Sequence, residues 1–137
     1  MTRKTFSLMI ALIAVSLAMF FSSPVPAADM RCAECGMTAD RESKFFAWII
    51  QGKDLLPFCD IGDLLTYLNR KSLAPASARV KDYPSGETIE ADKALYVHSE
   101  KAFRTPMGWG IAAFRNRQDA EKFGAVMDFP GASKAVK

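Results

Sequence analysis

An apolar segment near the N-terminus limits the size of the fold that this chain can form. The segment, residues 6–21, follows two basic residues and precedes a Pro-Ala-Ala sequence. Its 16 residues fall short of the roughly 20 that an uncleaved membrane-spanning helix needs. The layout is typical of a secretion signal that is cleaved after Ala27 or Ala28. Residues 1–28 are therefore predicted to be a signal peptide, and removing these 28 of the 137 residues leaves 109 for one compact domain.

The leader carries most of the net positive charge. The whole chain has 18 basic and 15 acidic residues, for a net charge of +3, and loss of Arg3 and Lys4 lowers that to +1. No basic stripe with interleaved aromatic residues remains, so we expect no nucleic-acid partner.

All three cysteines, Cys32, Cys35 and Cys59, lie in the predicted mature domain. Cys32 follows Asp-Met-Arg, which is unlike a lipoprotein signal, so we expect no lipid anchor. Paired thiols often form disulfides in an oxidising compartment. An odd number leaves at least one thiol over, which indicates reactivity or metal ligation.

Short apolar runs separated by turn residues predict an α+β fold. The expected strands are residues 45–50, 55–58, 79–83, 87–91, 94–98 and 110–114. One helix is expected from Asp60 through Leu68, and a second from Asn116 or Asp119 through about Val126. The two halves share this coarse order, which indicates a duplication within a domain at 29–130. Residues 131–137 have little to bury and are predicted to be a flexible tail.

Two sulfur-bearing loops suggest a metal site. Cys35-Gly36-Met37 places a thiol and a thioether around a glycine, which permits a tight turn. Pro106-Met107-Gly108 holds a second methionine between loop-forming residues, where an ordinary core methionine is badly placed. Cys35, Met37 and Met107 together would form a trigonal sulfur site, and soft sulfur ligands favour Cu(I).

Three further residues are candidate ligands, each with a simpler alternative. His98, the only histidine, could bind copper or could be a surface imidazole on the outward side of its strand. Cys59, at the start of a helix, could be an accessory ligand, a transfer thiol or a small buried side chain. Cys32 could be a ligand, a disulfide partner or a bystander.

Two other classes of protein fit the Cys-x-x-Cys spacing. A periplasmic thiol-disulfide oxidoreductase would use Cys32 and Cys35, although such a pair usually lies between a strand and a helix. A zinc-stabilised interaction module would use both cysteines with Cys59 and His98. No nucleophile–base pair, phosphate-binding glycine loop or dinucleotide fingerprint is evident, so we do not expect an enzyme.

The chain resembles the NosL family, the copper-binding accessory proteins of nitrous oxide reductase. The matching points are residues 32–37, 46–50, 52, 58, 60–62, 81–83, 89–91, 94–97, 106–108, 113–114 and 120–123. The resemblance implies two similar ββαβ-type halves, here about 29–78 and 79–130. It also implies delivery of Cu(I) for periplasmic maturation of nitrous oxide reductase or of a related copper enzyme. The expected partner is the reductase or its assembly complex. The copper donor is not implied.

Carried onto this chain, the resemblance implies Cys35, Met37 and Met107 as ligands, with His98 as an addition. Two features depart from the family. Many relatives are lipoproteins, whereas this leader lacks that signal, so we expect free diffusion in the periplasm. Cys59 is also not part of the family's common pattern.

Overall fold

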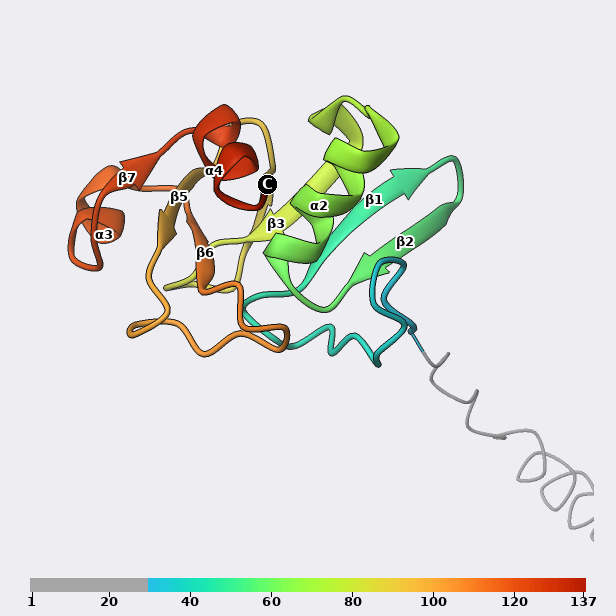
Figure 1. Cartoon of the computed structure of the whole chain (residues 1–137), viewed down its shortest axis with the longest axis horizontal. Helices are drawn as coiled ribbons and strands as arrows, with labels where there is room; N and C mark the ends of the chain where they lie inside the picture. The colour runs from blue at the N-terminus through green and yellow to red at the C-terminus, as the bar shows by residue number, and fades with distance from the viewer. Residues whose placement is uncertain (1–29) are drawn as a thin grey trace, which may run out of the picture.

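The computed structural model describes residues 30–137, so the predicted signal peptide lies outside the described residues (Figure 1). The chain forms short strands and helices, and each predicted strand appears within two residues of its expected ends. Their bounds are β1 (Ala47–Gln51), β2 (Asp54–Phe58), α2 (Ile61–Lys71), η1 (Pro75–Ser77), β3 (Ala78–Lys81), β4 (Thr88–Glu90), β5 (Leu95–His98), β6 (Ile111–Phe114), α3 (Arg117–Glu121), β7 (Val126–Met127) and α4 (Phe129–Ala135). Within residues 30–137, no helix has the length and apolar character needed to span a membrane.

The strands form two antiparallel sheets, with the orders β2-β1-β3-β4 and β6-β5-β7. In both sheets the first strand of a ββαβ unit lies at the centre, between the second strand and the strand that follows the helix. The α+β class and the two ββαβ units are therefore confirmed. The first unit also carries β4, so it extends to Glu90 and does not end at residue 78 as predicted.

The helix α2 forms as its sequence pattern predicts. Asp60 caps its N-terminus, with Oδ1 accepting a hydrogen bond from the Gly62 N–H at 3.0 Å. Apolar residues three and four apart line its inner face and are fully buried or nearly so, namely Ile61, Leu64, Leu65 and Leu68. The helix contacts β1, β2 and β6, and therefore packs against strands of both sheets.

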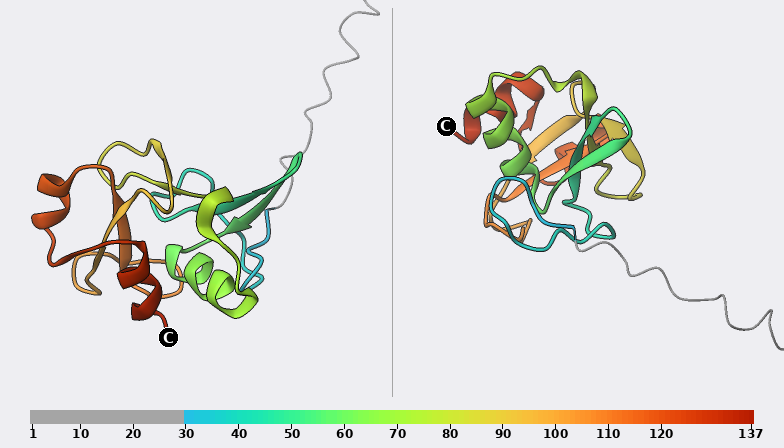
Figure 2. Two further views of the ribbon diagram at one scale, coloured as in Figure 1. Left: turned by 90° about the horizontal axis from the view of Figure 1, so that it is seen from above. Right: turned by 90° about the vertical axis from the view of Figure 1, so that its right-hand side faces the viewer.

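The predicted flexible tail is wrong, because α4 occupies most of that segment. Asp128 caps this helix by accepting the Gly131 N–H at 2.9 Å, and Ala132 is fully buried. Asn69 of α2 donates to the Ser133 carbonyl at 2.9 Å, so the two helices lie side by side (Figure 2). The second predicted helix is also shorter than expected, since α3 ends at Glu121.

Asp82 joins the two sheets at one point. It pairs with Ala113 of β6 in an isolated parallel bridge, and its Oδ1 accepts the Arg115 N–H at 2.8 Å. The next residue, Tyr83, donates its N–H to the Ala113 carbonyl at 2.8 Å. This junction fixes the second sheet beside the first, and so determines where the β5–β6 loop lies.

Candidate metal centre

The N-terminal loop, residues 30–39, presents two of the cysteines. The Cys32 N–H donates to the Met37 carbonyl at 2.7 Å, and the Gly36 N–H donates to the Cys32 carbonyl at 2.9 Å. Gly36 has φ +76°, a left-handed conformation that glycine adopts without strain. The Ala33 N–H donates to the Pro57 carbonyl at 2.9 Å, which ties the loop to β2.

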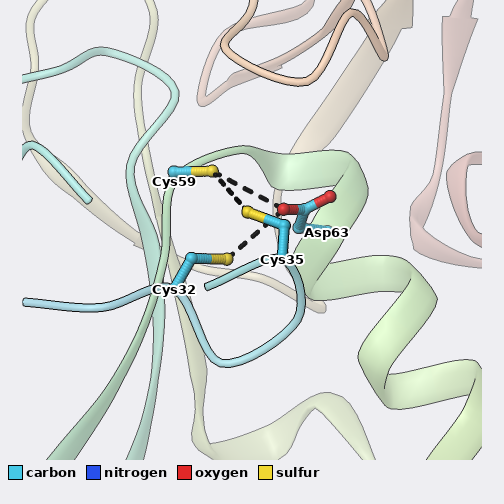
Figure 3. A group of neighbouring side chains, drawn as sticks. All are labelled: Cys32, Cys35, Cys59 and Asp63. Atoms are coloured by element: carbon cyan, nitrogen blue, oxygen red, sulfur yellow. Dashed lines mark hydrogen bonds between the residues drawn. The ribbon is translucent and has the colours of Figure 1, made fainter. Parts of the chain in front are cut away.

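The junction of β2 and α2 supplies the remaining members of the site. Cys59 follows β2, and Asp63 lies one helical turn later on the same side of α2. Figure 3 shows the thiol–carboxylate cluster, which we define as Cys32, Cys35, Cys59 and Asp63. One ligand atom from each residue lies within 4.8 Å of the others.

The contacts inside the cluster are short. The sulfur atoms of Cys35 and Cys59 are 3.4 Å apart. Cys32 Sγ donates to Asp63 Oδ2 at 3.3 Å, and Cys59 Sγ donates to the same oxygen at 3.5 Å. All three cysteines are free thiols. The geometry therefore brings three sulfur donors and one carboxylate oxygen around a common point.

Burial controls the protonation of two of these thiols. Desolvation raises the pKa of Cys35 to about 11, against a smaller opposing effect from its hydrogen bond with the Met37 backbone. The pKa of Cys59 is raised further, first by burial and then by its contact with Cys35 and the charges of Cys32 and Asp63. Both thiols therefore hold their protons at neutral pH, and a metal that binds them must displace those protons.

The β5–β6 loop, residues 99–110, closes over this end of α2. Trp109 lies so close to Gly62 that a Cβ atom there would be 2.0 Å from the indole ring. The Trp109 Nε1–H donates to Asp63 Oδ1 at 2.9 Å, and the Met107 N–H donates to Asp60 Oδ2 at 3.1 Å. The loop is thus fixed beside the cluster by two buried carboxylates.

Asp60, the first of these two carboxylates, is buried and accepts several hydrogen bonds. Burial raises the pKa of Asp60, and hydrogen bonds from Thr105, Gly62 and Met107 oppose that rise. Three donors from two separate chain segments therefore converge on one cap residue, next in sequence to Cys59.

Of the three residues in the predicted sulfur site, the structure places Cys35 in the cluster. The side chains of Met37 and Met107 are 49% and 41% exposed, which is unusual for methionine. Their backbones are anchored beside the cluster, Met37 on Cys32 and Met107 on Asp60. The three-sulfur site itself stays a prediction.

The other candidates separate clearly. Cys32 and Cys59 are buried and belong to the cluster, whereas His98 is exposed at the end of β5, opposite Ile111, and does not belong to it. The zinc hypothesis assigned His98 as the fourth ligand beside the three cysteines, whereas in the structure Asp63 lies at that position. Sequence analysis missed Asp63, although its spacing of four from Cys59 on a predicted helix was an available signal.

The fold and the cluster together define a small α+β protein with a thiol-rich candidate metal centre. The family model of NosL matches residues 25–131, and the chain belongs to the NosL family.

The solved structure of the copper chaperone NosL from Shewanella denitrificans is similar in fold, with a TM-score of 0.58. The two chains are 22% identical, and the match covers 73% of this chain and 87% of that one. No match was found among curated protein sequences.

Proposed function

We propose that this protein is a periplasmic metallochaperone that carries Cu(I) as cargo for the maturation of nitrous oxide reductase or a related copper enzyme. The observation that carries this function is the position of Cys35. It is the one partly exposed thiol of the cluster, and two exposed methionines, Met37 and Met107, have backbones hydrogen-bonded to Cys32 and to Asp60. Membership of the NosL family supports the same conclusion.

The proposed ligands are Cys35, Met37 and Met107. Met37 lies two residues from Cys35, and its backbone hydrogen-bonds to the Cys35 sulfur. Met107 is held by Asp60, which is next in sequence to Cys59. A thiolate with two thioethers is a soft donor set, and such ligands favour Cu(I) over the cations that prefer oxygen.

The exposure of both methionines suits a cargo that must leave. A three-coordinate ion at the surface has room for a ligand from a donor or client protein. Copper can then pass through shared coordination without entering solution. This mechanism is binding and transfer and requires no catalytic turnover.

Anaerobic titration of Cu(I) against a chromogenic competing chelator tests the ligand set. We expect Cys35→Ser to weaken Cu(I) binding by at least tenfold and Met107→Leu to weaken it measurably. Met127→Leu in β7 is the matched control, because it removes a thioether outside the proposed site. Unchanged affinity in both Cys35→Ser and Met107→Leu would contradict the proposed function.

The thiol environment argues against an oxidoreductase. Reactive redox cysteines have lowered pKa values, because the thiolate is the nucleophile. Here burial raises the pKa of Cys35 to about 11, and Cys35 contacts Cys59 at 3.4 Å. A Cys32–Cys35 exchange pair is therefore the weaker interpretation.

A further inference from the structure

We infer that Cys32, Cys35, Cys59 and Asp63 form a closed four-coordinate site for Zn²⁺, with a donor set different from that of the proposed copper site. Two ligands come from the N-terminal loop, one from the end of β2 and one from α2. Three of them are at most 3% exposed. Structural zinc sites are closed in this way, with four protein ligands in a tetrahedron.

The distances suit a tetrahedron of this composition. Bonds of about 2.3 Å to sulfur and about 2.0 Å to oxygen would put neighbouring sulfurs about 3.8 Å apart and sulfur about 3.5 Å from oxygen. The structure has 3.4 Å between Cys35 and Cys59, and 3.3 and 3.5 Å from the Asp63 oxygen to Cys32 and Cys59. Three of the six ligand–ligand distances are therefore already close to the tetrahedral values, and the other three pairs lie within 4.8 Å.

Charge and ligand hardness favour Zn²⁺ over Cu(I) at the full cluster. Three thiolates and a carboxylate carry four negative charges, so Zn²⁺ leaves a net charge of −2, as in an ordinary four-thiolate zinc site. Cu(I) would leave −3 at a buried place, which costs more. The carboxylate oxygen is also a hard donor, and Cu(I) prefers soft ones.

Groups around the cluster hold its ligands in place. The Trp109 Nε1–H hydrogen-bonds to Asp63 Oδ1, and the other carboxylate oxygen, Oδ2, contacts the sulfur atoms. The Met37 backbone hydrogen-bonds to the Cys35 sulfur. Such second contacts are usual for metal-binding carboxylates and orient the ligand atoms.

The zinc site would fasten the N-terminal loop to the start of α2. A consequence for copper rests on the proposed function, because Cys35 belongs to both donor sets. Zn²⁺ and Cu(I) would then compete for its thiolate, and zinc loading would weaken Cu(I) binding.

Titration of the reduced full chain with Co(II), a spectroscopic substitute for zinc, tests the site. We expect one Co(II) per chain, intense thiolate-to-cobalt absorption, a tetrahedral visible spectrum and displacement by one Zn²⁺. Asp63→Asn keeps the side-chain shape, and we expect it to raise the Kd for Zn²⁺ at least tenfold, as should Cys59→Ser. His98→Ala is the control and should leave the Kd unchanged.

Several outcomes would overturn the zinc site. These are less than one Zn²⁺ per chain, a Kd unaffected by Asp63→Asn, or an equal loss in His98→Ala. Circular dichroism of each metal-free variant separates lost ligation from lost folding, and the Co(II) spectrum of Asp63→Asn gives a second readout if Cys59→Ser fails to fold. Failure of the copper proposal is distinct, since it appears as Cu(I) affinity that is unchanged in both Cys35→Ser and Met107→Leu.

Discussion

The Trp109 indole lies across Gly62, and its Nε1–H reaches past that residue to Asp63 Oδ1 at 2.9 Å. A residue of the second half thereby covers the first turn of a helix in the first half. The contact requires glycine, because a Cβ atom at position 62 would lie 2.0 Å from the ring.

Gly62→Ala is expected to destabilise the protein by about 1–3 kcal/mol, as overpacking in a filled site usually does. Alanine is the better helix former by about 1 kcal/mol, so propensity alone predicts the opposite sign. Urea unfolding measures the difference, and a more stable variant would contradict the observed packing. Weaker Zn²⁺ binding by the same variant would show that the Trp109 contact supports the cluster.

Trp109→Phe separates the indole hydrogen bond from the packing of the ring. The variant keeps an aromatic ring over Gly62 and removes the donor to a buried carboxylate, a loss that typically costs about 1–3 kcal/mol. We expect lower stability in urea together with weaker Zn²⁺ binding. Trp48→Phe is the control, because Trp48 lies in β1, stacks on Phe46 and does not belong to the cluster. Equal effects of the two substitutions would argue against a specific role for Trp109.

The raised thiol pKa values predict a loss of stability at alkaline pH in the reduced, metal-free protein. Because Cys35 holds its proton more tightly when folded, its contribution is complete below the ordinary value of 9.0 and is lost as pH rises toward 11. Cys59, raised in the same direction, continues the loss. Urea unfolding at pH 7.5, 9 and 10.5 should show decreasing stability, and Cys35→Ala should flatten this profile. A profile unchanged by Cys35→Ala would be the contrary result.

Metal binding should show the opposite dependence on pH. A metal must displace the protons of these thiols, so apparent affinity rises with pH until they ionise. Competition titrations at pH 6.5, 7.5 and 8.5 in the presence of reductant measure the slope. An affinity that does not vary over this range would indicate that the thiols are not ligands.

Mild oxidation is expected to join Cys35 to Cys59. Their sulfur atoms are 3.4 Å apart, whereas Cys32 is engaged with Asp63 at 3.3 Å. Peptide mapping by mass spectrometry without reduction identifies the pair, and Cys32→Ser should not prevent it. A predominant Cys32–Cys35 disulfide would contradict this expectation. Bound Zn²⁺ should slow the reaction by occupying both thiols.

Local sequence signals predicted the elements well and their pairing poorly. The apolar spacing from Ile61 to Leu68 and the cap at Asp60 were sufficient to predict α2. The pairing of β1 with β3 was not predictable in this way, because Ala47 meets Val80 across a long stretch of chain. The predicted boundary of the first half, at about residue 78, was therefore placed too early in the chain.

The same limit applies to the site. Cys35 and Met37 were identified because they are neighbours in sequence. The approach of Cys59 to Cys35 spans 24 residues, and it depends on the N-terminal loop binding to β2 through Pro57. The helix α4 was missed because its sequence has few apolar residues. It is stabilised only when Ala132 packs against the rest of the core.

The hydrogen bond from Trp109 to Asp63 crosses from one repeat to the other. A gene that encoded only the first repeat would keep every thiol and yet lose the clamp on the carboxylate. Each repeat alone would thus lack part of the proposed metal site. Metal affinity would then depend on both repeats being folded and joined.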